Sequence, residues 1–86
     1  MAGPVNAEIA ARVLGCVVNT QHLEPGRVTI DSTFQELGID SLAGINIVFA
    51  IENEFNISVP DDAAQQARTV RDLVEGVEKL LVEQAR

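Results

Sequence analysis

Residues 41–55, SLAGINIVFAIENEF, carry apolar side chains on two opposite sides of the helix that they are expected to form. At about 100° per residue, the first apolar stripe consists of Gly44, Ile47, Val48, Ile51 and Phe55. The second stripe lies nearly opposite and consists of Leu42, Ile45 and Phe49. A helix that is apolar all round is either buried on both sides or exposes one stripe to a partner. Because a chain of 86 residues offers few helices to cover both stripes, the sequence favours a docking surface.

The length and composition indicate one globular domain, which we expect to span residues 1–86. A hydrophobic share of 47% is typical of a folded protein, and an aromatic share of 3% predicts a small aliphatic core. No run approaches the ~18 apolar residues of a membrane span and no signal peptide is evident, so we expect a cytoplasmic protein without a membrane span. Cys16 and His22 are the only residues of their types, which excludes an internal disulfide and a Cys/His zinc site.

Apolar periodicity predicts three main helices and one short helix. Their approximate ranges are 7–19, 41–55, 61–66 and 69–84, with a short turn at 33–37. Asn6 and Asp40 stand where N-caps of the first two main helices are expected, and Thr69 and Asp72 have capping-box spacing. No segment alternates strongly enough to form a sheet. The predicted fold is therefore all-α, an up-and-down four-helix bundle with a long loop between the first two main helices.

The long loop contains a second capping-box pattern, formed by Thr33 and Glu36. Gly38 follows at the position where a helix would end. One or two helical turns here would place Phe34 and Leu37 on the core.

The acidic charge is concentrated in the middle of the chain. The formal net charge is −7, and the segment from Val28 to Ala67 contains no Lys or Arg. Its acidic residues are Asp31, Glu36, Asp40, Glu52, Glu54, Asp61 and Asp62. Such a segment repels phosphate backbones and anionic lipids, so we expect no nucleic-acid or membrane-surface role. It attracts basic surfaces of partner proteins, although an acidic surface can also serve only to keep a protein soluble.

Ser41 lies in the stretch LGIDSL, where a loop ends and the two-striped helix begins. It lacks the Gly-x-Ser-x-Gly pattern of a hydrolase nucleophile, because Ile39 and Ala43 stand at the glycine positions. His22 is distant in sequence, so we expect no catalytic residues. A phosphate ester on Ser41 would instead meet unpaired backbone N–H groups and the positive end of the helix dipole. The pattern favours a serine that is modified over one that catalyses.

The stretch LGIDSL resembles the acyl carrier protein family when it is read with its neighbours AGINIVFAIENEF, ISVPDD, STFQELG and TVRDLVEGV. The resemblance covers roughly residues 7–82. It implies a four-helix bundle in which Ser41, between Asp40 and Leu42, receives a 4′-phosphopantetheine arm from coenzyme A. It also implies a non-catalytic, free-standing carrier of acyl thioesters in fatty-acid, polyketide or specialised lipid biosynthesis. In many members of the family the bundle interior holds the acyl chain.

The resemblance also implies partners and the surface that they contact. The partners are a phosphopantetheinyl transferase and acyl-loading and acyl-processing enzymes with basic docking patches, and the carrier is expected to be a monomer. The docking positions are Leu42, Ile45, Asn46, Phe49 and Glu52. Asn46 and Asn53 stand where carriers of fatty-acid synthesis often have glutamates, which favours a specialised pathway.

Two other functions are compatible with the sequence. One is an aminoacyl or peptidyl carrier, although such carriers usually have two glycines before the modified site and this chain has Gly38 followed by Ile39. The other is an unmodified acidic adaptor that binds a partner through Leu42, Ile45 and Phe49. A calcium site is not expected, because no Asp-x-Asp-x-Asp-Gly loop is present.

Overall fold

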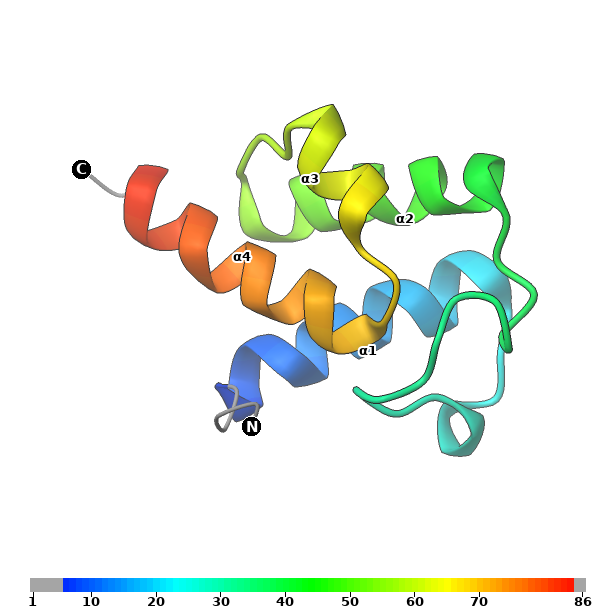
Figure 1. Cartoon of the computed structure of the whole chain (residues 1–86). Coiled ribbons are helices and arrows are strands. Elements are labelled where there is room, and N and C mark those ends of the chain that lie inside the picture. The colour runs from blue at the N-terminus through cyan, green and yellow to red at the C-terminus, as the bar shows by residue number, and fades with distance from the viewer. Residues whose placement is uncertain (1–5, 85–86) are drawn as a thin grey trace.

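The computed structural model describes residues 6–84 as a bundle of α-helices (Figure 1). The helices are α1 (Ala7–Gln21), α2 (Ser41–Phe55), α3 (Asp61–Gln66) and α4 (Val70–Gln84), with a 3₁₀ turn η1 at Pro25–Arg27. The predicted all-α fold with three main helices and one short helix is confirmed. Within residues 6–84 the only strand-like pairing is an isolated bridge between Thr33 and Thr69. The ends of the expected domain, residues 1–5 and 85–86, lie outside the described residues.

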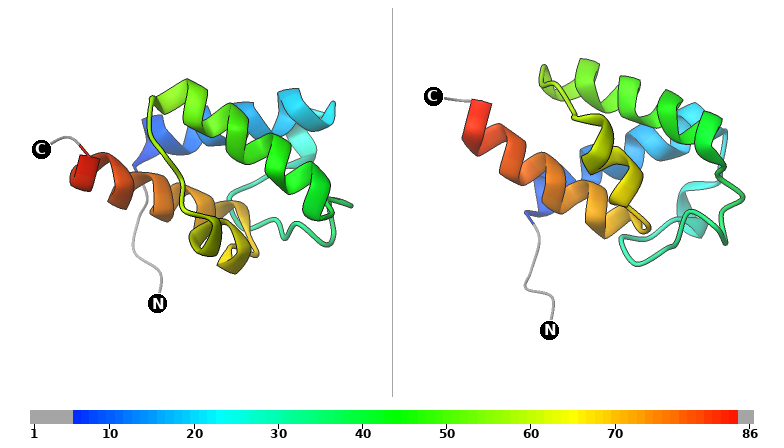
Figure 2. Two further views of the ribbon diagram at one scale, coloured as in Figure 1. Left: turned by 90° about the horizontal axis from the view of Figure 1, so that it is seen from above. Right: turned by 45° about the horizontal axis from the view of Figure 1, so that its top comes forward.

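The direction of α4 differs from that expected for an up-and-down bundle. In the views of Figures 1 and 2, α2 and α4 both run back against α1 and therefore run in the same general direction. The reason is that the chain does not turn sharply after α2. Residues 56–69, which include α3, carry it back to the end at which α2 began (Figure 1).

The core is formed by one face of each main helix. Its fully buried side chains are Val13, Val17, Ile47, Ile51, Val70 and Val74. One face of α4 belongs to this core, since Val70, Leu73, Val74 and Val77 are buried and Leu80 and Leu81 pack against them. Phe34 and Leu37 from the long loop also pack on this core, as expected. The core is aliphatic apart from Cys16, Phe55 and the partly buried Phe34.

The predicted N-caps form, and they explain where the helices begin. The Asn6 side chain accepts hydrogen bonds from the N–H groups of Glu8 and Ile9 at 3.0 and 3.1 Å. Asp72 accepts from the N–H of Thr69 at 3.1 Å, and Thr69 Oγ1 accepts from the N–H of Asp72 at 3.2 Å. Thr69 is thus the cap of α4 rather than its first helical residue.

α1 ends later than the sequence predicted, at Gln21 instead of residue 19. Thr20 lies in the last turn of the helix, and its hydroxyl donates to the carbonyl of Cys16 at 2.8 Å. His22 ends the helix in a left-handed conformation with φ 55°, and its N–H donates to the Val18 carbonyl.

The loop between α1 and α2 is tied to the start of α4 by backbone hydrogen bonds. The N–H of Val70 donates to Ser32 O at 3.1 Å, and the N–H of Phe34 donates to Arg68 O at 3.0 Å. An ion pair of 3.0 Å joins Arg71 to Asp31. These contacts hold the loop against the bundle although it has little regular structure.

The second capping box forms without the helix that was expected to follow it. The N–H of Thr33 donates to Glu36 at 2.8 Å, and the N–H of Glu36 donates to Thr33 Oγ1 at 3.1 Å. Residues 34–38 form turns and not a helix. Gly38 adopts φ 73°, a conformation that glycine permits, and it redirects the chain toward α2.

Within residues 6–84, no helix combines the length and the apolar character needed to cross a bilayer. The cytoplasmic location stays a prediction.

The two stripes of α2 predict responses of different size to the same substitution. Ile47 is 1% exposed and Ile45 is 49% exposed. We expect Ile47→Ala to lower the free energy of unfolding by about 2–5 kcal/mol, because it leaves a cavity in the core. Ile45→Ala should change it by less than about 0.5 kcal/mol. Urea denaturation of both variants measures the difference, and equal losses would mean that the second stripe is also packed.

Candidate functional site

Ser41 is the first residue of α2 and is exposed to solvent. The preceding residue, Asp40, is extended and caps the helix as predicted, since its Oδ1 accepts a hydrogen bond from the N–H of Ala43 at 2.8 Å. The carbonyl of Asp40 accepts from the N–H of Gly44 at 2.8 Å. Asp40 therefore fixes the first turn of α2 and directs its own carboxylate into that turn.

The N–H groups of Ser41 and Leu42 also lie at this terminus, and the cap does not use them. In the part of the chain that the structure describes, neither has a hydrogen-bond acceptor. Free N–H groups and the positive end of the dipole make a helix N-terminus a favourable place for an anionic group. The geometry suits a phosphate ester on the Ser41 hydroxyl.

The structure does not pair Ser41 with a base. His22, the only histidine, is an exposed residue that ends α1. Among the hydrogen bonds of residues 6–84, none joins Ser41 to His22 or to a carboxylate. An activated serine nucleophile needs a base within hydrogen-bond reach.

The second apolar stripe of α2 is uncovered, which decides between the two interpretations of this helix. Leu42 is 71% exposed, Ile45 49% and Phe49 57%. The first stripe contributes Ile47, Ile51 and Phe55 to the core. The interpretation in which α2 is buried on both sides is therefore wrong, and Leu42, Ile45 and Phe49 form an exposed surface that begins next to Ser41, here called the docking face.

The two polar residues expected to belong to this surface differ in their surroundings. Asn46 is exposed between Ile45 and the buried Ile47. Glu52 is half-buried, and its Oε2 accepts a hydrogen bond from the N–H of Val59 at 2.8 Å. Glu52 therefore helps to position the segment that leads from α2 to α3, a contact that the sequence did not reveal.

The fold also pairs some of the acidic charge that looked free in the sequence. Arg12 of α1 forms an ion pair of 2.8 Å with Glu54 and lies 4.3 Å from the centre of the Phe55 ring. Asp31 is paired with Arg71. Asp40, Asp61 and Asp62 remain exposed. The acidic potential is thus weighted toward the N-terminus of α2 and toward α3.

Cys16 is a buried thiol. Burial raises its pKa, the neighbouring Glu54 raises it further, and Arg12 opposes the change. Because the thiolate is the reactive form, a raised pKa makes Cys16 a poor nucleophile at neutral pH. In residues 6–84, no group of three or more His, Cys, Asp or Glu residues is arranged to hold a metal ion.

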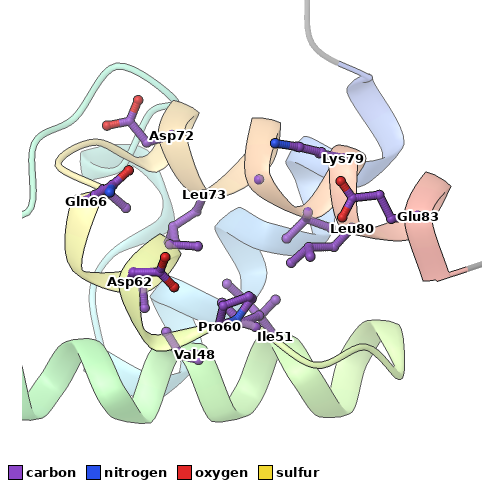
Figure 3. Close-up of a pocket in the computed structure, with 16 residues that line it drawn as sticks. Val48, Ile51, Pro60, Asp62, Gln66, Asp72, Leu73, Lys79, Leu80 and Glu83 are labelled. Carbon is purple, nitrogen blue, oxygen red and sulfur yellow. The ribbon is translucent and has the colours of Figure 1, made fainter.

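A hollow of about 310 Å³ lies between α2, α3 and α4 (Figure 3). Its apolar wall includes Val48 and Ile51 of α2 and Leu73 and Leu80 of α4. The sequence did not locate this hollow, because it depends on how residues 56–69 cross between two helices. The signal that could have pointed to it is the set of small lining residues, Ala63, Ala64, Ala67 and Gly76.

An exposed serine at a helix N-terminus, an apolar face beside it and a hollow between the helices are features that suit a small carrier domain. Residues 7–77 match the family described as "Phosphopantetheine attachment site". The chain is 38% identical over 76 residues to the acyl carrier protein of two Porphyromonas gingivalis strains, covering 87% of this chain and 97% of that protein. Its fold is similar to the crystal structure of an acyl carrier protein from Thermotoga maritima, with a TM-score of 0.78, 30% identity and coverage of 90% and 91% of the two chains.

This chain therefore belongs to the acyl carrier protein family. It contains a phosphopantetheine attachment site and is a non-catalytic carrier, as the resemblance implied. Membership of the family implies a phosphopantetheinyl transferase and acyl-processing enzymes as partners.

The contribution of the Asp40 cap to the free energy of unfolding can be measured by substitution. We expect Asp40→Ala to lower the free energy of unfolding by about 1 kcal/mol, because the N–H of Ala43 loses its acceptor. Asp40→Asn keeps an oxygen at the same position and should lose less. Urea denaturation of the two variants checks this, and an Asp40→Ala variant as stable as the wild type would show that the bond contributes nothing.

Proposed function

We propose that the Ser41 hydroxyl is the attachment point of the 4′-phosphopantetheine arm and that the protein carries acyl groups between partner enzymes. The single observation that supports this most strongly is the position of Ser41 as an exposed first residue of α2, beside N–H groups without a protein acceptor. The family match supports the cofactor, and the motif LGIDSL supports the residue. Ser32 is buried and is therefore a poor acceptor for a transferase.

The surroundings of Ser41 fit a phosphodiester. A negative charge near a helix N-terminus is stabilised by about 0.3–1 kcal/mol at an exposed site. Asp40 adds a like charge, but its carboxylate accepts the N–H of Ala43 and is held in the first turn. The N–H groups of Ser41 and Leu42 would face the phosphate oxygens. When bound, the arm supplies the thiol on which acyl groups are held as thioesters.

We further propose that the cargo is acyl rather than aminoacyl. An acyl chain gains free energy when it leaves water for an apolar environment, at about 0.8 kcal/mol per buried CH₂ group. The hollow between α2, α3 and α4 has an apolar wall that can receive such a chain. An aminoacyl group would bring a charged amine to this wall and gain little. Fatty-acid, polyketide and specialised lipid pathways all supply acyl cargo, and the aminoacyl carrier stays the alternative.

The docking face is the proposed contact surface for the transferase and for the acyl-processing enzymes. Leu42, Ile45 and Phe49 present a small apolar area, and exposed Asn46 adds a polar edge. Its size suits a transient complex of a monomeric carrier. Exposed Asp40 lies at one end of this surface and would attract a basic patch on a partner. Glu52 would offer its Oε1 to such a patch, because the N–H of Val59 bonds to Oε2.

The attachment is tested by measuring intact mass after incubation with coenzyme A and a broad-specificity phosphopantetheinyl transferase. We expect the wild type and Ser58→Ala to gain one phosphopantetheinyl group, because Ser58 is exposed but is not at a helix N-terminus. Ser41→Ala should gain none while it remains folded. A wild type that gains no group would overturn the proposal and leave the unmodified adaptor, whereas a modified Ser41→Ala variant would place the arm elsewhere.

The docking face is tested by the rate at which the transferase modifies Ser41. We expect Leu42→Ala and Phe49→Ala each to lower kcat/KM by roughly tenfold, the effect of losing an interface residue worth about 1.4 kcal/mol. Val82→Ala is the matched control, because Val82 is 64% exposed but lies on α4. Added salt should slow the reaction of all variants, since it screens the attraction of opposite charges. An equal loss of kcat/KM in Val82→Ala would contradict a defined docking face.

A further inference from the structure

We propose that Gln84, in the last turn of α4, positions the carboxylate of Glu52 beside the docking face through the peptide group that joins Ser58 to Val59. Gln84 is then a positioning residue for a partner that presents a basic side chain next to its apolar contact area. The inference rests on the proposed function, because it requires a partner on the docking face. It goes further by giving a role in docking to a helix that contributes no residue to that face.

α2 carries two carboxylates, and they face different surroundings. Glu54 forms an ion pair of 2.8 Å with Arg12 and is therefore turned toward α1. Glu52 lies three residues after Phe49 and seven residues after Ile45, so the three positions follow one face of the helix. Glu52 is therefore the carboxylate of α2 that a basic side chain of a partner would meet beside the docking face.

Glu52 is ordered before a partner arrives. A free glutamate side chain has several rotamers, and a partner that binds it must pay for the lost freedom. Here Oε2 of the half-buried Glu52 accepts a hydrogen bond from the N–H of Val59 at 2.8 Å. A carboxylate accepts several hydrogen bonds, so Oε1 can receive a basic side chain while Oε2 is held. The bond from Val59 thus lowers the entropic cost of docking.

The N–H of Val59 can order Glu52 only if the backbone around Val59 is itself held. Residues 56–60 join α2 to α3 and have no helical structure. α3 gives this linker little support, since none of its residues is buried. Ile57 is buried and fixes the start of the linker, whereas Ser58 is exposed. The direction of the Val59 N–H therefore depends on what holds Ser58.

Gln84 holds Ser58 with two hydrogen bonds. Its Oε1 accepts from the N–H of Ser58 at 3.1 Å, and its Nε2 donates to the carbonyl of Ser58 at 2.9 Å. The two helices can share this linker because the ends of α2 and α4 lie at the same end of the bundle (Figure 1). Two bonds in opposite directions fix both the position and the orientation of the Ser58 backbone.

The carbonyl of Ser58 and the N–H of Val59 belong to one peptide group. This group is planar and rigid, so fixing its carbonyl also fixes the direction of its N–H. Gln84 bonds to the carbonyl side and Glu52 to the N–H side of the same group. The path from Gln84 to Glu52 thus consists of two hydrogen bonds and one rigid unit, which makes the orientation of the carboxylate depend on Gln84.

The experiment measures the dissociation constant of the apo carrier for the phosphopantetheinyl transferase by calorimetric titration without coenzyme A. We expect Gln84→Ala to raise Kd about threefold, within the range for ordering one long side chain on binding. Glu52→Gln keeps an oxygen for the Val59 N–H but removes the charge, and it should also raise Kd. Gln84→Ala should cause no further rise when it is added to Glu52→Gln, because its effect passes through the Glu52 carboxylate.

Two further measurements separate positioning from a general loss of structure. Exchange of the Val59 N–H with water, measured by NMR, should be faster in Gln84→Ala than in the wild type. Val82→Ala is the matched control, because Val82 is an exposed residue near the same end of α4, and it should change neither Kd nor this exchange. Gln84→Met keeps the length of the side chain without its hydrogen bonds, and it replaces Gln84→Ala if that variant does not fold.

The outcomes separate the inference from the function on which it rests. A carrier that the transferase neither binds nor modifies would overturn both. A carrier that is modified, but whose Kd is the same in the wild type and in Gln84→Ala, would overturn the inference alone. The inference also fails if Gln84→Ala raises Kd equally with Glu52 and with Glu52→Gln, or if Kd rises without faster exchange of the Val59 N–H.

Discussion

The rest of the structure depends on the packing of α2, which the other helices cover on one side only. Ile47, Ile51 and Phe55 join one core with the apolar faces of α1 and α4, and α1 packs against both of the other main helices. Three main helices can cover only one stripe of α2, so Leu42, Ile45 and Phe49 stay in water. The same packing that stabilises the bundle therefore creates the docking face and places it next to Ser41.

The position of Ser41 depends on a loop that has little regular structure of its own. Residues 30–34 are held by backbone hydrogen bonds to residues 68–71 at the start of α4. Gly38 then turns the chain so that Asp40 can cap α2. A residue proposed to be modified by one enzyme and presented to others must be exposed and yet held in place. Ser41 is exposed, and these contacts hold the loop that precedes it. Such a site needs no catalytic residues, because its partners supply the chemistry.

The local features of the chain could be predicted from the sequence because they depend on neighbouring residues. Capping by Asn6, Asp40 and Thr69 uses side chains within three residues of their N–H donors, and apolar periodicity identified the buried faces. The extent of the domain and the role of each site residue stay predictions. Two of the errors were also local: α1 continues through Thr20 to Gln21, and the capping box at Thr33 was followed by turns.

The sequence by itself determined the all-α fold, the family resemblance and the serine at the start of α2, since each follows from short patterns along the chain. Only the tertiary structure decided which stripe of α2 is covered and that α4 runs with α2 rather than against it. It also decided that Arg12 and Arg71 neutralise Glu54 and Asp31, and that a hollow opens beside Gly76. These features join residues far apart in the sequence, so they depend on how whole helices pack and not on the propensity of any one segment.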